Sequence, residues 1–217
     1  MTESMGRAPL RSVSRVLLAT RNDAKLEELR RMTSSQGLEV IGLADVPEFP
    51  EAPEVGATFE ENALAKARDA AAATGYVAVA DDSGLTVDAL NGMPGILSAR
   101  WSGRSGSREE RDARNLALVL DQTADVPEER RGAAFVCAAA AAHPDGRVVV
   151  VVERWPGRLI RLPRGTNGFG YDPAFVPDGE SRTSAEMAPE EKDAVSHRSR
   201  ALRALIPRLS ELGSSVS

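Results

Sequence analysis

Two long apolar runs on either side of a turn motif constrain the fold of this chain more than any other feature. The runs are AAFVCAAAAAH at 133–143 and RVVVVVERW at 147–155, and Pro144-Asp145-Gly146 lies between them. Proline, aspartate and glycine are typical turn residues, and β-branched valines favour strands. The segment therefore predicts an antiparallel hairpin.

Helices and strands alternate in the first part of the chain. Short apolar runs predict strands, and stretches of helix formers between them predict helices. The expected order is strand 15–20, helix 24–32, strand 38–43, a helix from a capping box at Thr58 and Glu61 to Gly75, and strand 76–81. Together with the hairpin, this order predicts an α/β protein with a mixed sheet.

Three further elements are expected around and after the hairpin. A second capping box, Ser107 with Glu110, predicts a helix to about Leu120. GRLIRL at 157–162 predicts another strand, and a last helix is expected from about Ser196, with a kink at Pro207.

A chain of 217 residues suits one compact domain, which we expect to span residues 15–212. Residues 1–14 are polar and lack the apolar stretch of a signal peptide, so they predict a disordered leader, with a tail at 213–217. No apolar run approaches the ~20 residues that cross a bilayer. We therefore expect a cytoplasmic protein that does not insert into membranes.

Charge and cysteine content exclude several functions. The net charge of −5 argues against a general nucleic-acid binder, which needs a basic surface, but it allows a small phosphorylated ligand. The single cysteine, Cys137, lies in an apolar run, so we expect a buried thiol without redox chemistry. The only lysines are Lys25, Lys66 and Lys192. That rarity either marks positions that require lysine or reflects an arginine-rich composition.

The predicted strand-to-helix junction at 20–25, TRNDAK, carries polar groups suited to phosphate. It combines a hydroxyl, an amide and an ammonium group at a point where backbone N–H groups and the helix dipole attract anions. The junction lacks the glycines of a Walker P-loop. Asn22 or Asp23 can therefore equally be the N-cap of the helix.

Adjacent carboxylates follow the predicted strand 76–81. Neighbouring side chains of a strand point to opposite faces, so one of Asp81 and Asp82 should face a site. Such a carboxylate can hold Mg²⁺ or deprotonate water, whereas Asp-Ser-Gly is also common turn material. Glu54 precedes the helix that starts at Thr58 and is either a second metal ligand or a surface acid.

The helix after Thr58 and two later segments contribute further candidates. Asn62 and Lys66 are four residues apart and share one helix face, although Lys66 can also be a plain exposed lysine. An aromatic ring of GFGYD at 168–172 can stack on a base or anchor the loop in the core. SHR at 196–198 offers donors to a ligand, but a lone histidine is usually structural, and no neighbouring histidine or cysteine supports zinc.

Together these segments resemble the inosine triphosphate pyrophosphatase family, the pyrophosphatases of non-standard purine nucleotides. The resemblance spans residues 16 to about 209 and consists of five strings in the family's order. They are LLATRNDAKLEEL, GATFEENALAKA, VAVADDSGLTVDALNGMPGILSARWSG, GTNGFGYDPAFVP and TSAEMAPEEKDAVSHRSRAL. Arg21 departs from the pattern, because family members often carry a small residue there.

The resemblance implies an elongated mixed sheet flanked by helices, two lobes with a nucleotide cleft between them, and a homodimer. It implies Mg²⁺ as the cofactor, Asp82 as proton acceptor and metal ligand, and Glu54 as a further metal-associated acid. The candidate substrate-binding residues are Thr20, Arg21, Asn22, Asp23, Ala24, Lys25, Asn62, Lys66, Ser83, Phe169, Gly170, Tyr171, Asp172, Lys192, His197 and Arg198.

The activity implied is hydrolysis of ITP, dITP and XTP to the monophosphate and pyrophosphate, which keeps these nucleotides out of DNA and RNA. Two alternatives stay open. One is a pyrophosphatase of the related septum-associated family, which acts on modified pyrimidine nucleotides, although SHR and FGYD favour the purine reading. The other is a nucleotide-binding protein without turnover, which would not need Asp81, Asp82 and Glu54.

Overall fold

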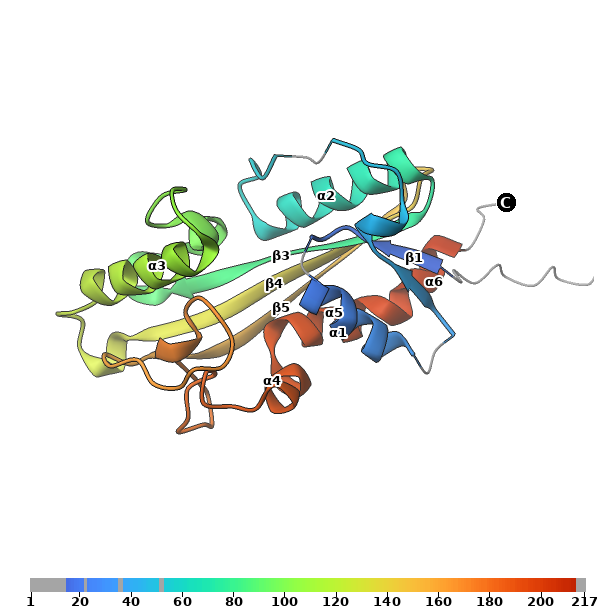
Figure 1. Cartoon of the computed structure of the whole chain (residues 1–217). Helices are drawn as coiled ribbons and strands as arrows, with labels where there is room; N and C mark the ends of the chain where they lie inside the picture. Colours follow the sequence, from blue (N-terminus) through green and yellow to red (C-terminus); the bar gives the residue numbers. More distant parts are fainter. Residues whose placement is uncertain (1–14, 22, 35–36, 51–52, 214–217) are drawn as a thin grey trace, which may run out of the picture.

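One mixed sheet runs the length of the molecule in the computed structural model (Figure 1). The structure describes residues 15–21, 23–34, 37–50 and 53–213. The expected leader and all but the first residue of the expected tail lie outside the described residues. Within the described part of the chain, no helix is both long and apolar enough to cross a membrane.

The sheet has six strands in the order β2-β1-β3-β4-β5-β6. The strands are β1 (Arg15–Leu18), β2 (Glu39–Ile41), β3 (Val77–Val87), β4 (Gly132–Ala142), β5 (Val148–Leu159) and β6 (Phe175–Pro177). β1 pairs in parallel with β2 and β3, and every other pairing is antiparallel. The mixed sheet and the β4–β5 hairpin predicted from the sequence are confirmed.

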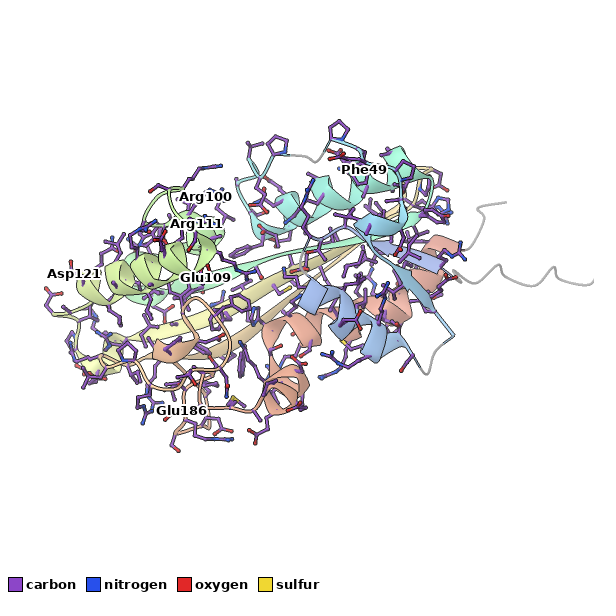
Figure 2. All side chains as sticks on the ribbon, in the orientation of Figure 1. Phe49, Arg100, Glu109, Arg111, Asp121 and Glu186 are labelled. Carbon is purple, nitrogen blue, oxygen red and sulfur yellow. The ribbon has the colours of Figure 1, made fainter. Side chains whose placement is uncertain are left out.

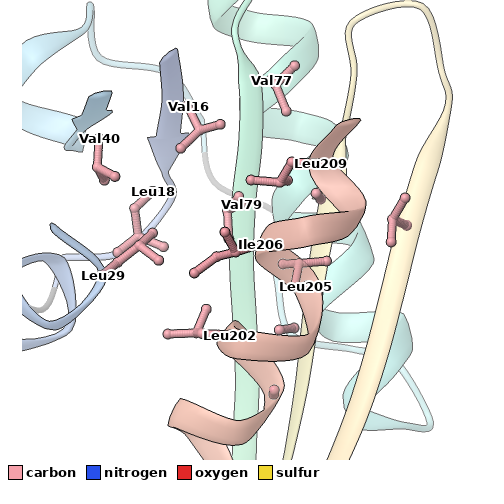
Figure 3. Packing of buried hydrophobic residues seen from close by; sticks show 14 of the residues in the cluster. Val16, Leu18, Leu29, Val40, Val77, Val79, Leu202, Leu205, Ile206 and Leu209 are labelled. Atoms are coloured by element: carbon pink, nitrogen blue, oxygen red, sulfur yellow. The ribbon is translucent and has the colours of Figure 1, made fainter. Parts of the chain in front are cut away.

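Helices cover both faces of this sheet. They are α1 (Asp23–Thr33), α2 (Phe59–Thr74), α3 (Arg108–Gln122), α4 (Pro189–Val195), α5 (His197–Leu205) and α6 (Ser210–Gly213). Leu29 of α1 and Leu202 of α5 share one apolar cluster with Val16 and Val79 of the sheet (Figure 3). α2 packs on the opposite face, and α3 lies at the far end of the long strands (Figure 1). The result is an elongated molecule with two lobes joined by β3, β4 and β5.

The contact between α2 and the sheet is built from methyl groups. The alanines in this seam are each 1% exposed or less, namely Ala63, Ala67, Ala70, Ala71, Ala78, Ala80, Ala138 and Ala140. Because an alanine side chain is a single methyl group, the helix lies close to the strands. This short separation brings polar side chains at the start of α2 within reach of β3.

Two sequence predictions about strands were wrong. The strand expected at 76–81 does not end in a turn at the acidic pair but continues to Val87, because β4 pairs with it from Ala78 through Val87. GRLIRL is not a separate strand, since Gly157–Leu159 form the end of β5 and pair with β6. The extended backbone on both sides of each predicted break satisfies its hydrogen bonds in the sheet.

Helix ends follow the predicted capping chemistry with one difference. Ser107 and Glu110 form the complete capping box of α3. Thr58 accepts a hydrogen bond from the Glu61 N–H, as expected, but the Glu61 carboxylate accepts from the N–H of Ala57 instead of that of Thr58. At Pro207, where a kink was expected, the last helix changes into a 3₁₀ turn, η6 (Ile206–Leu209).

Glycine at position 84 allows a 3₁₀ segment, η3 (Gly95–Arg100), to lie directly on β3. A Cβ atom at Gly84 would be 2.3 Å from Ser98 Oγ and 2.6 Å from the Gly95 carbonyl oxygen. Ser98 Oγ in turn accepts a hydrogen bond from the Leu85 N–H at 2.9 Å. The glycine of the DDSG string is therefore required by packing and not by a turn.

Gly84→Ala should lower the free energy of unfolding by about 2 kcal/mol, because overpacking a tight contact forces η3 away from β3. Chemical denaturation of Gly84→Ala, Ser98→Ala and the double variant would measure the effect. We expect the Gly84→Ala change to cost less when Ser98 Oγ, its nearest neighbour, is absent. Strictly additive effects in this cycle would contradict the proposed contact.

Candidate active site

The acidic pair, Asp81 and Asp82, lies in β3 just after this strand stops pairing with β1. The β1–β3 ladder ends at the pair Leu18 and Val79, whereas β3 continues to Val87. Asp81 and Asp82 therefore lie just beyond the carboxyl end of β1, beside the junction that leads into α1. Crevices outside the carboxyl ends of parallel strands are common ligand sites in α/β proteins.

Asp82 faces α2 and takes part in a charged cluster. Asn62 Nδ2 donates to Asp82 Oδ2 at 2.9 Å, and Lys66 Nζ lies 3.5 Å from Asp82 Oδ1. Lys66 also donates to Glu54 Oε1 at 2.9 Å. The predicted shared face of Asn62 and Lys66 is confirmed, and one ammonium group bridges the two predicted metal-associated carboxylates.

Burial and charge oppose each other in this cluster. Burial raises the pKa of Asp82 above its ordinary value, although the Lys66 charge and the Asn62 hydrogen bond act in the other direction. Burial also disfavours the charged form of Glu54, but its hydrogen bond to Lys66 and the nearby cations lower its pKa overall. Of the two acids, Asp82 is thus the better placed to accept a proton.

Asp81 faces the opposite side of the sheet and binds two cations there. Lys25 Nζ, from the first turn of α1, lies 2.6 Å from Asp81 Oδ2, and Arg198 Nε, from the start of α5, lies 3.4 Å from the same oxygen. The Asp81 side chain is 1% exposed. The sequence left open which of Asp81 and Asp82 faces a site; in the structure, Asp81 pairs with two predicted substrate-binding residues that are 173 positions apart.

The glycine-rich loop divides its two aromatic rings between solvent and core. Phe169 is 58% exposed, with Lys192 Nζ 5.4 Å and the Arg108 guanidinium 4.9 Å from its ring centroid. Tyr171 is 5% exposed and donates its hydroxyl to the Ser98 carbonyl at 2.8 Å. Phe169 is therefore available for stacking, whereas Tyr171 anchors the loop in the core.

The loop is also fixed by a buried carboxylate. Asp172 accepts hydrogen bonds from the Phe169 N–H at 2.9 Å and from Ser184 Oγ at 2.7 Å, and it forms a close ion pair with Lys192. Gly170, the residue after Phe169, has a φ of 62°, a backbone conformation that favours glycine. Asp172 and Lys192 thus set the position of the Phe169 ring.

His197 stacks on Phe135, with ring centroids 4.9 Å apart and an interplanar angle of 12°. Burial lowers the pKa of His197 to about 3, so the imidazole is neutral at physiological pH. Its Nδ1 is buried without a hydrogen-bond partner among the described residues. One face of the imidazole ring is therefore supported by Phe135, while its Nδ1 atom makes no hydrogen bond to the described residues.

The remaining predicted residues differ in what the structure describes. Asn22 and the side chains of Asp23 and Ala24 lie outside the described residues. Thr20 and Arg21 line a cavity of about 580 Å³ between the β1–α1 junction and the segment around Phe49, which is labelled in Figure 2. Ser83 follows Asp82 in β3 and is partly buried.

Two observations complete the surroundings of the acidic pair. The Cys137 thiol lies in β4 opposite Ser83 and is buried, with a pKa raised by burial, as expected of an inert thiol. Arg100 donates through one guanidinium nitrogen to Glu54 Oε2 at 3.3 Å and was missed in the sequence. The two residues are 46 positions apart, and neither a motif nor a spacing links them.

Asp82 and Glu54 are carboxylates of the type that hold Mg²⁺ in proteins. No group of three or more histidine, cysteine or acidic side chains suited to a metal occurs among the described residues. Mg²⁺ is usually held by one or two carboxylates and completes its shell with phosphates and water. Asp82 and Glu54 supply such a pair of carboxylates, and the ammonium group of Lys66 already lies between them.

Comparison with known proteins gives consistent matches over almost the whole chain. The Ham1 family model matches residues 16–208. The dITP/XTP pyrophosphatase of Nocardia farcinica is 60% identical over 204 residues, which cover 93% of this chain and 97% of that protein. The crystal structure of the nucleoside-triphosphatase / dITP/XTP pyrophosphatase from Mycobacterium abscessus has a TM-score of 0.74 at 61% identity and covers 89% of this chain and 99% of that one.

A more distant structure agrees with the same fold. The HAM1 protein from Coxiella burnetii has a TM-score of 0.82 at 39% identity, over 91% of this chain and 98% of that one. The range of the family match, residues 16–208, includes every segment of the site.

Asp81→Asn should lower the free energy of unfolding by about 3 kcal/mol, because it leaves Lys25 and Arg198 without their buried counter-charge. Asp193→Asn is the matched control: Asp193 pairs with Arg31 at 3.0 Å on the surface, and its loss should cost at most about 1 kcal/mol. Denaturant titrations of both variants measure the difference. Equal effects would show that the Asp81 pairs contribute no more than a surface ion pair.

Proposed function

Because the chain belongs to the Ham1 family, we propose that it hydrolyses non-standard purine nucleoside triphosphates, ITP, dITP and XTP, to the nucleoside monophosphate and pyrophosphate. The observation that carries this proposal is the cluster of Asp82, Glu54 and Lys66 beside the β1–α1 junction. It combines a carboxylate that can accept a proton with cations that attract phosphate. The family match also confirms the resemblance found in the motifs.

The reaction needs a water molecule, a proton acceptor and a stabilised leaving group. Water attacks the α-phosphorus, a new P–O bond forms, and the bond from the α-phosphorus to the bridging oxygen breaks, so pyrophosphate leaves. Asp82 takes the proton from the attacking water, and its raised pKa suits that role. Asn62 orients this carboxylate by donating a 2.9 Å hydrogen bond from Nδ2 to Asp82 Oδ2.

Positive charge on both sides of β3 can neutralise the phosphates. Lys66 lies at the Asp82 face and Lys25 at the Asp81 face, close to the α1 N-terminus. Electrostatic stabilisation of this kind supplies most of the acceleration in phosphoryl transfer. A magnesium ion bound by Asp82 and Glu54 would add Lewis-acid stabilisation of the phosphate oxygens.

The base would bind at the other end of the site. Phe169 offers an exposed ring for stacking. Arg198 carries only donors, so it suits the keto oxygen of hypoxanthine or xanthine and opposes the amino group of adenine. Lys192 and Asp172 keep the Phe169 loop in position, and neutral His197 offers a second contact. The dITP/XTP names of the relatives favour this purine reading over the pyrimidine alternative.

The cellular role that follows is removal of damaged purine nucleotides from the precursor pool of DNA and RNA. A homodimer and a cytoplasmic location complete the proposal, and both rest on the resemblance to the family. The proposal needs no nucleic-acid or membrane partner.

A panel of nucleoside triphosphates, assayed for pyrophosphate release with Mg²⁺ and with EDTA, tests the proposed function. ITP, dITP and XTP should be hydrolysed only with Mg²⁺, and ITP should exceed ATP in kcat/KM by about 100-fold or more. Asp82→Asn should lower kcat about 1,000-fold in a folded protein, because the amide cannot take the proton. Nucleotide binding without pyrophosphate release would favour a binding protein instead.

The pH profile of Lys66→Met tests the link between Lys66 and Asp82. Burial raises the pKa of Asp82 and the Lys66 charge lowers it, so removal of that charge should raise the pKa further. Because Asp82 acts as a carboxylate, the acidic limb of the kcat/KM profile should move to higher pH. Lys66→Arg, which keeps the charge, should retain the parent limb. An unshifted limb in Lys66→Met would remove either Lys66 or Asp82 from the proposed step.

A further inference from the structure

Arg100 ends η3 and reaches across the start of α2 to Glu54. One guanidinium nitrogen donates to Glu54 Oε2 at 3.3 Å and the other to the Glu54 carbonyl oxygen at 3.2 Å. The side chain is 17% exposed. Figure 2 shows Arg100 on the side of the molecule where α3 and the loop before α2 approach each other.

Both carboxylate oxygens of Glu54 are occupied by cations. Lys66 binds Oε1 at 2.9 Å and Arg100 binds Oε2 at 3.3 Å. A metal ion that bound Glu54 would therefore compete with these two cations for the same carboxylate oxygens. The bond from Arg100 to the Glu54 carbonyl does not depend on the carboxylate, so the guanidinium can stay nearby when that carboxylate turns away.

The backbone that carries Arg100 is fixed relative to Asp82. Ser98, two residues before Arg100, contacts the Leu85 N–H and the Gly95 carbonyl through its hydroxyl, at 2.9 and 2.6 Å. Gly84 allows this close packing on β3, only two residues beyond Asp82. The guanidinium thus extends from a segment that packs on β3 two residues beyond Asp82.

The charges of the cluster balance only without a ligand. The two negative charges of Asp82 and Glu54 are balanced by the two positive charges of Lys66 and Arg100. Lys66 contacts both acids, and Arg100 contacts Glu54. A nucleoside triphosphate brings more negative charge than one divalent ion cancels, so a site for it needs further cations. Arginine suits this role because its planar guanidinium can bind two phosphate oxygens at once.

We propose that Arg100 is a phosphate-binding residue whose guanidinium Glu54 holds in the free protein and gives up to the leaving pyrophosphate when Glu54 binds the divalent ion. The inference rests on the proposed function and names a further residue of the same site. It makes Glu54 a shared partner for which Arg100 and the metal compete. Removal of Arg100 should therefore affect metal and phosphate binding in opposite directions.

Two titrations of the full chain, both without nucleotide, test this competition in Arg100→Gln. Mn²⁺ binding, followed by electron paramagnetic resonance, should become tighter, because Glu54 has lost one competing cation. Pyrophosphate binding, followed by calorimetry at Mn²⁺ concentrations that saturate each protein, should weaken about tenfold or more. Arg104→Gln removes an exposed arginine four residues along the chain and should change neither.

Arg100→Lys keeps the charge but not the two-point geometry, so its pyrophosphate affinity should lie between those of the parent and Arg100→Gln. Opposite signs of the two effects in Arg100→Gln, together with an intermediate Arg100→Lys, support the proposal. Unchanged or weaker Mn²⁺ binding, or unchanged pyrophosphate binding, overturns it. Because neither titration uses a nucleoside triphosphate, a failure of the proposed hydrolysis would be seen separately in the substrate panel.

Discussion

The alternation of side chains along β3 is the constraint on which the rest of the site depends. Since strand residues point to opposite faces, Asp81 and Asp82 cannot share one set of partners. Each carboxylate needs its own cations, and the fold supplies them from different elements: α1 and α5 for Asp81, α2 for Asp82. The helices on the two faces are thus oriented by electrostatics as well as by apolar packing.

This division separates support from chemistry. The Asp81 side chain is almost fully buried and pairs with both Lys25 and Arg198, so it ties the start of α1 to the start of α5. The cluster at Asp82 is more open, with Glu54 40% exposed, and its contacts are of the kind that a charged ligand can replace. The ion pairs of Asp81 on one face of β3 therefore involve a buried carboxylate, whereas those around Asp82 on the other face are open to exchange with a ligand.

The sequence was sufficient for the order of the main elements, the hairpin and the shared face of Asn62 and Lys66, because these depend on local periodicity and on motifs. The sequence led to a wrong prediction where local residue preferences and strand pairing disagree. The glycine at position 84 is typical of a turn, yet ten consecutive residue pairs between β3 and β4 keep the backbone extended. It left the role of Tyr171 open, since burial decides between stacking and anchoring. The contact of Arg100 with Glu54 depends on packing between distant segments, which no spacing in the chain encodes.

The alanine seam under α2 gives the molecule a mechanical property. The distance from helix to sheet is set by single methyl groups, and Lys66 and Asn62 are attached to that helix. A larger residue anywhere along the seam would lift the helix and lengthen both contacts with Asp82 together. The separation of Lys66 and Asn62 from Asp82 is therefore adjustable through side-chain volume at positions that carry no polar atom.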